Sequence, residues 1–312
     1  MSSIDLDLLV QNLGAYFRKN GAELFRKLLL EQPMSEVATT LSDVTDEIVL
    51  LDLVSSSILK PWKVDFEPTP NALKFKPRIG KTRASKADVS IIPKTLHKQF
   101  LAYRKAKGAD PYNLPFEELL LDRVTEQARL DMDTHALFEG VYDADGNGPA
   151  DTMVGWLTHL DLAQAENAFE EKTVDIETIT KANAIDMVER LVEGIPSPYL
   201  KNPMKLFCSP TVERYYALDY RERYGALPYN KEFQKNMIDG TMIEFHSHSG
   251  ISTKDKMFVT PAKNMVMMFD SMDDLSSLIV ERNARAVNVM LDVNAGVDFA
   301  TLDLVWYAKN KA

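Results

Sequence analysis

The sequence predicts an α+β fold, in which helices and strands are mixed without a repeating βαβ order. One observation is the stretch from Pro115 to Gly140, which has the character of a long helix. Another is the C-terminal part, which holds several strand-like runs rich in β-branched and aromatic residues. The third is an apolar content of 45% in 312 residues, enough for one large domain or two ordinary ones with real cores.

The chain begins with apolar residues at the spacing of an amphipathic helix. A break at Asn20–Gly21 predicts a second short helix after it, and Pro33 ends that helix. We interpret this segment as an N-terminal arm whose apolar stripe packs on its own body or on a neighbouring molecule. The stripe consists of Leu6, Leu9, Leu13 and Phe17.

The next segment, residues 46–59, is apolar enough to be buried but too short to assign as helix or strand. Prolines then punctuate an extended passage that leads into a basic stretch, Lys74 to Lys107. The basic stretch holds eight Lys and three Arg against the single acid Asp88, although the whole chain has a net charge of −10. Such a one-sided block repels itself unless it reaches into solvent or lies against acidic surface.

Acidic surface is available nearby in the sequence. Residues 110–177 hold seventeen Asp and Glu against three basic residues. This complementarity predicts association of copies head to tail, with the basic stretch of one on the acidic body of the next. The alternatives are a solvated loop and a nucleic-acid contact. The nucleic-acid contact is less well supported, because the net charge of the chain is negative and few aromatic residues are available for base stacking.

The clearest helix starts at Pro115, a residue suited to the first helical position, and ends at Gly140. Glu117 and Glu118 near its start favour the positive end of the helix dipole. A glycine-rich turn, DADGNGP, follows it. A second helix is expected from Ile179 to Glu193.

The remaining elements are a strand at MKLFCS, a helix from Pro210 to Gly225, and extended segments at MIEFHSH and KMFVTPAKNMVMMFD. Two final strands, ARAVNVMLDVNAG and ATLDLVWYA, are expected on either side of an Asn-Ala-Gly turn.

Two patterns carry candidate chemistry. Asp143, Asp145 and Asn147 match the first ligand positions of a calcium loop, but Val154 stands where the bidentate Glu belongs, so a plain turn is favoured. His246 and His248 are two apart on an expected strand and would share a face, yet two histidines do not make a metal site. No nucleophile elbow, phosphate loop or dinucleotide fingerprint is present. We therefore expect no catalytic residue, no cofactor and no bound metal.

Taken in order, these features resemble the major capsid proteins of tailed phages, the Hong Kong 97 fold. The arm, the proline-flanked basic hairpin, the long acidic helix and the turn Asp145-Gly146-Asn147-Gly148 resemble that family's N-terminal arm, extended E-loop, P-domain spine helix and following turn. The helix ending in VEGIPSPY, the strand MKLFCS with its helix, and the final ERNARAVNVML strand resemble the A-domain and the return to the P-domain.

The resemblance implies a division of the chain into six segments. They are an N-terminal arm (1–60), an E-loop (61–107), a P-domain with the spine helix (108–155), an A-domain (156–278), a P-domain return strand (279–297) and an A-domain terminal strand (298–312). In this family the E-loop reaches over an adjacent subunit. We therefore expect inter-subunit contacts at the basic residues Lys74, Lys76, Arg78, Lys81, Arg83 and Lys86, at the acidic residues Glu117, Glu118, Asp122 and Glu126, and at the arm stripe.

The implied function is a structural one, self-assembly into an icosahedral shell around the double-stranded DNA genome of a phage. The partners are hexamers and pentamers of the same chain, scaffold, portal and decoration proteins, and DNA held by weak non-specific contact, with no membrane. The expected location is the virion, after assembly in the host cytoplasm. The alternatives are an encapsulin-like nanocompartment shell and a metal-dependent enzyme using His246 and His248.

Overall fold

The structure is a computed structural model that describes residues 6–30, 33–55, 58–65, 67–70, 72–92, 116–166, 172–225, 237–270 and 278–310. The chain divides into two compact units, each built from separate segments of the sequence. Unit 1 contains Met1–Thr45, Thr82–Thr158 and Met267–Gly296, and unit 2 contains Asp46–Lys81, His159–Val266 and Val297–Ala312. The division of the chain into arm, E-loop, P-domain and A-domain segments stays a prediction.

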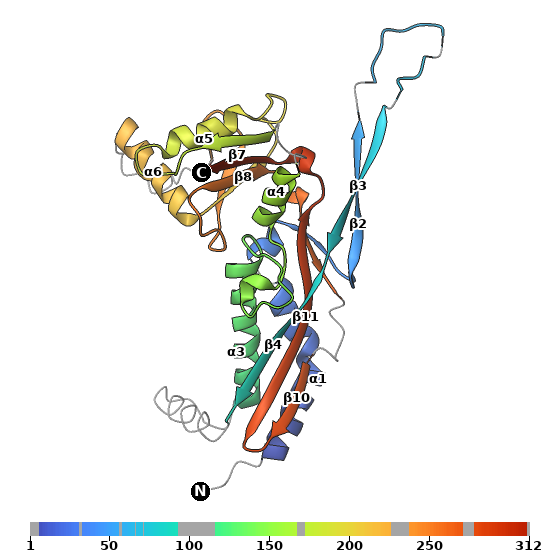
Figure 1. Ribbon diagram of the computed structural model, residues 1–312, viewed down its shortest axis with the longest axis vertical. Coiled ribbons are helices and arrows are strands. Elements are labelled where there is room, and N and C mark those ends of the chain that lie inside the picture. The colour runs from blue at the N-terminus through green and yellow to red at the C-terminus, as the bar shows by residue number, and fades with distance from the viewer. Residues whose placement is uncertain are drawn as a thin grey trace. The chain divides into compact units, whose positions relative to one another are not determined.

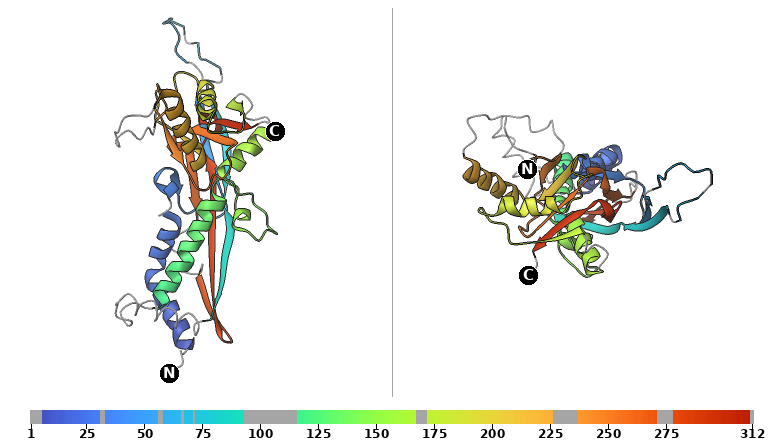
Figure 2. Two further views of the ribbon diagram at one scale, coloured as in Figure 1. Left: turned by 90° about the vertical axis from the view of Figure 1, so that its left-hand side faces the viewer. Right: turned by 90° about the horizontal axis from the view of Figure 1, so that it is seen from above.

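Two long helices of unit 1 pack side by side, α1 (Leu6–Leu30) and α3 (Phe116–Asp131) (Figure 2). The predicted break at Asn20–Gly21 is wrong, because α1 is one continuous helix. A mid-helix glycine costs about 1 kcal/mol. Burying one large apolar side chain contributes about 1.5 to 3 kcal/mol, and α1 buries several of them. They are Leu13, Phe17, Leu24, Leu28 and Leu29.

The helix predicted from Pro115 is confirmed as α3. It continues into a π-helical turn, η2 (Met132–Ala136), and reaches the predicted glycine, whose N–H donates to Ala136 O at 3.2 Å. The predicted turn after it is also present and contains η3 (Pro149–Asp151). Helix α4 (Trp156–Ala165) follows. At its start Trp156 meets Phe138 edge to face, with ring centroids 5.1 Å apart.

One five-stranded sheet is ordered β1–β9–β11–β10, and β4 pairs with β11 as well. Figure 1 shows the long β11 running between β4 and β10. The predicted turn at Asn294-Ala295-Gly296 is wrong, because β11 runs straight through it, and Ala295 is buried opposite Arg83. The bounds are β1 Thr39–Leu41, β4 Arg83–Ile91, β9 Met265–Phe269, β10 Leu278–Asn283 and β11 Ala286–Phe299.

The second five-stranded sheet lies in unit 2 and has the order β5–β12–β8–β6–β7. Its bounds are β5 Thr173–Ile176, β6 Met204–Cys208, β7 Ile243–Ser247, β8 Lys256–Thr260 and β12 Trp306–Asn310. The sheet packs with α5 (Ala184–Glu193) and α6 (Pro210–Tyr224) around one apolar core that includes Leu206, Val188 and Trp306. Ser209 caps α6, its Oγ accepting from Val212 N at 3.3 Å. The strand at MKLFCS and the helix from Pro210 are therefore confirmed.

A two-stranded antiparallel sheet is formed by β2 (Glu47–Ser55) and β3 (Leu73–Lys81), which also lie in unit 2. Their register runs from Glu47 opposite Lys81 to Ser55 opposite Leu73. The apolar segment that the sequence left open between helix and strand is therefore a strand. Short 3-10 turns complete the description: η1 Pro33–Glu36, η5 Ala262–Asn264 and η7 Leu302–Leu304. Across the described ranges, no helix combines the length and apolar character that crossing a membrane requires.

Candidate functional site

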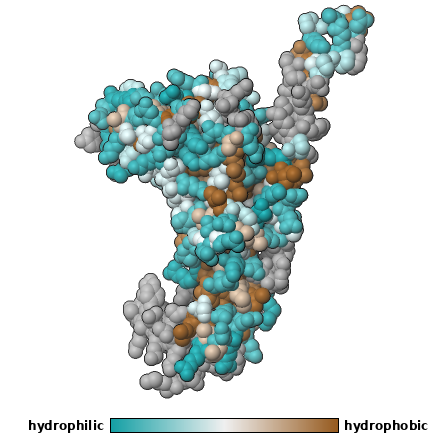
Figure 3. Space-filling view, in the orientation of Figure 1, coloured by the Kyte–Doolittle hydropathy of each residue, from teal (hydrophilic) through white to brown (hydrophobic). Residues whose placement is uncertain are grey.

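The hairpin of β2 and β3 carries an apolar surface that the sequence analysis did not single out. We call residues 58–65, the described part of its connecting segment next to β2, the tip segment. Leu59, Trp62 and Val64 are 94%, 87% and 86% exposed, and Ile58 is exposed as well. Figure 3 shows hydrophobic side chains at the surface of this hairpin. Large apolar side chains this exposed, several within one short segment, are typical of a surface that another molecule covers.

Polar contacts shape the tip segment from within. Lys60 Nζ donates to Glu67 O at 3.0 Å, and Lys63 Nζ lies 3.3 Å from Glu67 Oε2. Both lysines are thus engaged in local contacts, while the apolar side chains between and beside them face outward. The sequence signal for this surface was a group of large apolar residues close to prolines, Ile58, Leu59, Trp62 and Val64. A loop that is only solvated has no reason to carry such residues.

The basic stretch is not one extended loop, because its described part forms strands. Arg78 and Lys81 lie on β3, whereas Arg83 and Lys86 lie on β4. The E-loop bounds stay a prediction, and the reason for the strands is visible in β4. Its residues alternate between exposed and more buried positions, as a strand with one covered face does, and nine of them are in register with β11. Residues 93–107 lie outside the described residues.

The basic side chains have partners within the chain. Lys81 Nζ lies 3.9 Å from Glu47 Oε2, and Lys86 Nζ lies 2.8 Å from Asp88 Oδ2. The guanidinium of Arg83 lies over the Tyr142 ring, 4.3 Å from its centroid. Lys81 and Lys86 are more than half exposed, so their charges remain available to a second molecule. The side chains of Lys74 and Lys76 lie outside the described residues.

Arg78 differs from these residues, because it makes a largely buried ion pair. Its Nε donates to Asp298 Oδ1 at 2.7 Å, and its Nη2 lies 2.6 Å from the same oxygen. The Asp298 side chain is 2% exposed. Arg78 thus has a partner within unit 2, and its contact with a neighbouring subunit stays a prediction. No local pattern in the sequence indicated Asp298 as the partner, since 220 positions separate the two residues.

The acidic residues expected to receive the basic stretch lie on α3. Asp122 Oδ1 lies 3.8 Å from Lys27 Nζ of α1, and Glu126 accepts from Arg123 at 3.1 Å. Both carboxylates keep more than a third of their surface exposed. Glu117 and Glu118 lie in the first turn of α3, but their side chains lie outside the described residues. A contact between this face and a second copy remains a prediction.

The arm stripe contributes to the core of unit 1. Leu13 is 0% exposed and Phe17 is 4% exposed, because α1 packs against α3 and β10. Their expected burial against neighbouring subunits is therefore corrected to burial within the chain. The reason is that α3 offers an apolar face of its own, including Leu120 and Leu121. The side chains of Leu6 and Leu9 lie outside the described residues.

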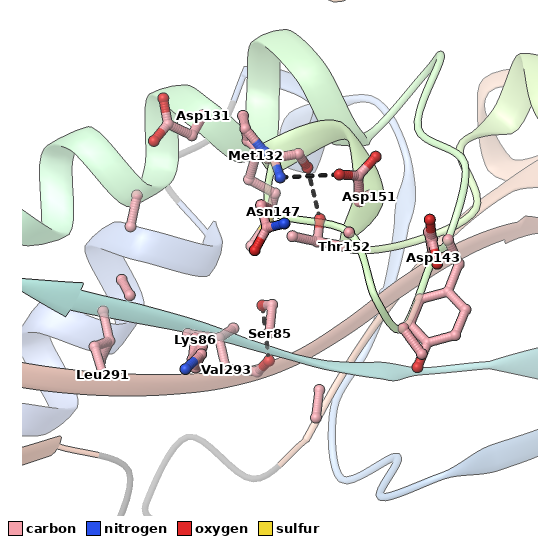
Figure 4. A pocket seen from close by; sticks show the side chains of 18 of the residues that line it. Ser85, Lys86, Asp131, Met132, Asp143, Asn147, Asp151, Thr152, Leu291 and Val293 are labelled. Atoms are coloured by element: carbon pink, nitrogen blue, oxygen red, sulfur yellow. Dashed lines mark hydrogen bonds between the residues drawn. The ribbon is translucent and has the colours of Figure 1, made fainter.

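The turn after α3 uses its carboxylates to hold its own backbone. Asp143 Oδ1 accepts from Asp145 N at 3.0 Å, and Asp151 Oδ2 accepts from Gly148 N at 2.9 Å. Figure 4 shows Asp151 and Thr152 of this turn on one side of a cavity of about 550 Å³, with Ser85 and Lys86 of β4 across it. The calcium-like spacing of the sequence is explained by these turn contacts.

His246 and His248 have packing and turn roles in the structure. His246 lies on β7, its ring 5.2 Å from that of Phe207, and burial lowers its pKa to about 4, with Lys205 and His248 adding to the shift. His248 follows the strand, and its Nδ1 accepts from Gly250 N at 3.0 Å. Over the part of the chain that the structure describes, no three His, Cys, Asp or Glu residues are grouped to hold a metal ion.

Several solved structures match this chain over nearly its whole length. One match is a chain of the satellite phage P4 procapsid that includes the size determination (Sid) protein, with a TM-score of 0.67, 15% identity, and 92% of this chain and 90% of that chain covered. A chain from Microbacterium phage Oxtober96 matches with a TM-score of 0.53 and 10% identity over 90% and 91% of the two chains. A chain of the capsid of an empty GTA particle matches with a TM-score of 0.51 and 12% identity over 89% of both.

At the level of sequence, no family model and no curated protein matches the chain. The likeness therefore lies in the arrangement of elements, which persists where identity has fallen to 10–15%. The phage and GTA particle chains share the mixed helix-and-sheet architecture over about nine tenths of their length. The chain has the tailed-phage capsid fold that its sequence predicted.

Proposed function

We propose that this chain is a major capsid protein, which assembles through hexamers and pentamers into an icosahedral shell around the double-stranded DNA genome of a tailed phage. The observation that carries the proposal is the whole-chain likeness to a chain of a phage procapsid. A fold alone does not give a function, so the proposal also needs a surface suited to assembly. The hairpin supplies that surface.

An exposed apolar segment such as the tip segment suits a subunit of a shell, because a neighbouring copy can cover it. A protein that functions as a monomer has no use for such a segment. Burial of a side chain such as Leu59, Trp62 or Val64 contributes about 1.5 to 3 kcal/mol. In a single chain these side chains contribute almost nothing, because 86% or more of each is exposed to water. A second copy that covers the tip segment recovers this free energy at every contact, and a closed shell repeats the contact around its symmetry axes.

Charge supports the same arrangement. Exposed Lys81 and Lys86 lie near the start of the chain's basic region, and the exposed carboxylates of α3 offer an opposite charge on a neighbouring copy. Exposed ion pairs are worth about 0 to 1 kcal/mol each, so these pairs select orientation more than they supply affinity. The proposed role is structural, with no catalytic residue.

We include scaffold, portal and decoration proteins among the proposed partners, and the packaged DNA would contact the inner surface weakly and without sequence preference. We place assembly in the host cytoplasm and the final product in the virion. Nuclease-treated particles from infected cells should retain double-stranded DNA. Particles that enclose protein cargo and no DNA would instead favour a nanocompartment shell.

The experiment that tests the proposal changes the tip segment and leaves the cores intact. The variant Leu59→Ser/Trp62→Ser/Val64→Ser removes the exposed apolar surface, and Leu162→Ser/Met242→Ser serves as a control with exposed apolar residues lost elsewhere in unit 2. We expect the tip variant to keep the thermal stability of the original chain but to stay unassembled by size-exclusion chromatography, whereas the control forms shells. Normal shells from the tip variant would refute the role given to the hairpin.

A further inference from the structure

The ion pair between Arg78 and Asp298 joins the hairpin to another part of unit 2. Arg78 lies on β3, opposite Leu50 of β2, and Asp298 lies one residue before the end of β11. Arg78 directs Nε and Nη2 at the same carboxylate oxygen, at 2.7 and 2.6 Å. Two donors of one planar guanidinium on one carboxylate fix the direction of the side chain as well as its distance.

The surroundings of Asp298 make this pair hard to replace by water. The Asp298 side chain is 2% exposed and that of Arg78 is 25% exposed. Asp298 Oδ1 also accepts from Phe299 N at 2.7 Å. A buried carboxylate that loses its cation is strongly destabilising, because the charge stays behind without compensation. The pair of the Arg78 guanidinium with the buried Asp298 carboxylate therefore holds β3 against the end of β11.

A third group lies beside the pair. His159 Nδ1 is 4.0 Å from Asp298 Oδ1, and its Nε2 lies 2.9 Å from Val297 O. Burial lowers the pKa of His159, which keeps the imidazole neutral near pH 7, and the guanidinium of Arg78 adds to this effect against the opposing charge of Asp298. At neutral pH a positively charged Arg78 and a neutral His159 therefore lie beside this carboxylate.

Arg78 lies far from the tip segment along the hairpin, so a small rotation at Arg78 moves the tip segment by a larger distance. It is three residues from the end of β3, whereas the tip segment lies beyond the other end of the strand. Each strand residue adds about 3.3 Å, so the five steps from Arg78 to Leu73 alone span roughly 17 Å. Because β2 and β3 are paired over nine residues, they move together, and a small rotation at Arg78 becomes a large displacement of the tip segment.

We propose that Arg78 and Asp298 form a clamp that sets the direction of the β2–β3 hairpin relative to the rest of unit 2. In the proposed shell, which this last step presupposes, the clamp determines where the tip segment meets a second copy. Arg78 is then a positioning residue that touches no neighbour itself. This differs from the role expected from the sequence, in which Arg78 contacts the acidic surface of the next subunit.

The test measures the hairpin's direction in the unassembled full chain. Spin labels at Asp65→Cys in the tip segment and Glu189→Cys on α5 report the distance between the hairpin and the core of unit 2, both positions being exposed. Cys208 is buried and should remain unlabelled. Single and double changes are compared in this background: Arg78→Met, Asp298→Asn, and Arg78→Met/Asp298→Asn. The control is Glu47→Gln/Lys81→Met, which removes the exposed ion pair of the same hairpin.

The double variant separates positioning from stability. The double variant removes both charges and so leaves no buried carboxylate without a cation. We therefore expect its melting temperature to lie closer to that of the original chain than the melting temperature of Arg78→Met does. We nevertheless expect its distance distribution to shift and broaden as in the single variant, while the control keeps the narrow distribution of the original chain. A double variant with the original distribution would overturn the clamp, and so would a broad distribution in the original chain.

Shell formation by the same variants is a separate readout. Loss of shells with a shifted distance supports the whole proposal, whereas normal shells with a shifted distance refute the link to assembly. If the original chain forms no shells, the proposed function fails, but the distance measurement still decides whether the clamp exists.

Discussion

Lys86 and Asp88 form an ion pair on the exposed side of β4, with Nζ and Oδ2 2.8 Å apart. The hydrogen bond that Lys86 donates to Asp88 raises the pKa of Lys86. Asp88 is the single acid of the basic stretch, and it neutralises one of the cations that the sequence marked for contact with a neighbour. The charge available to a second copy is therefore smaller than a count of Lys and Arg indicates.

Charge reversal in the basic stretch should act through the sum of weak pairs. Lys86→Ala alone should leave assembly nearly unchanged, because the pair is exposed. The triple variant Lys81→Glu/Arg83→Glu/Lys86→Glu should block assembly while circular dichroism shows a folded chain. Arg78 is left unchanged, because reversing it would place a second carboxylate beside buried Asp298.

A matched control for this series reverses three exposed cations of unit 2, Lys181→Glu/Arg190→Glu/Lys201→Glu. Shells that form normally from the basic-stretch variant would show that these charges do not bridge subunits. If such shells then package less DNA, the charges face the genome instead.

Gly155 is required by a close backbone approach. Its N–H donates to Gly140 O at 2.9 Å, and a Cβ at this position would lie 2.4 Å from Phe138 O. Gly155→Ala should lower the free energy of unfolding by about 1 to 3 kcal/mol or more, because backbone must move to make room. Gly14→Ala is the control: its Cβ meets Arg18 at an ordinary 3.6 Å within α1, so about 0.5 to 1 kcal/mol of stabilisation is expected. Urea unfolding measures both, and equal effects would contradict this account.

Asp219 links two helices of unit 2 through a buried carboxylate. It accepts from Ile185 N of α5 at 3.0 Å and from Arg223 Nε of α6 at 2.8 Å. Asp219→Ala should cost about 1 to 3 kcal/mol, since it leaves the buried Ile185 N–H without its acceptor. Asp186→Ala removes the exposed partner of the same arginine and should cost only about 0 to 1 kcal/mol. Similar melting temperatures for the two variants would show that burial of Asp219 is not decisive.

The stability of unit 2 should depend on pH through His246. Burial holds its folded pKa at about 4, below the ordinary 6.5. Between pH 6.5 and about 4 the unfolded chain therefore binds a proton at His246 that the folded chain does not bind. The free energy of unfolding is therefore highest above pH 6.5 and decreases as the pH falls toward 4. His246→Gln should flatten this decline in urea titrations, and exposed His135→Gln should not. An unchanged slope in His246→Gln would mean that other groups dominate.

The sequence predicted best those elements whose signals are local. Helix α6 has Ser209 and Pro210 at its start, and both stand where capping requires them. Predictions failed where tertiary contacts outweigh local preference. Gly21 did not interrupt α1, because the helix buries an apolar stripe on both sides of it. Asn294 did not begin a turn, because its Nδ2 donates to Asp270 Oδ2 at 3.0 Å and its neighbours pair with β4.

The candidate site was predicted in part. The sequence marked the hairpin region through its prolines and charges, and the exposed apolar residues of the tip segment were visible there but not used. The role of Arg78 was beyond sequence reasoning, because its partner lies 220 positions away and nothing local distinguishes it from Lys81 or Arg83. Likewise, Leu13 and Phe17 have the pattern of a stripe that must be buried, and periodicity does not say whether the covering surface belongs to the same chain.

Negative-stain electron microscopy of the purified chain tests the central claim most directly. The proposed function predicts closed shells of uniform size, or hexameric and pentameric capsomers that close into shells at higher concentration. A protein that stays monomeric at every concentration and carries about one bound metal ion per chain would contradict it.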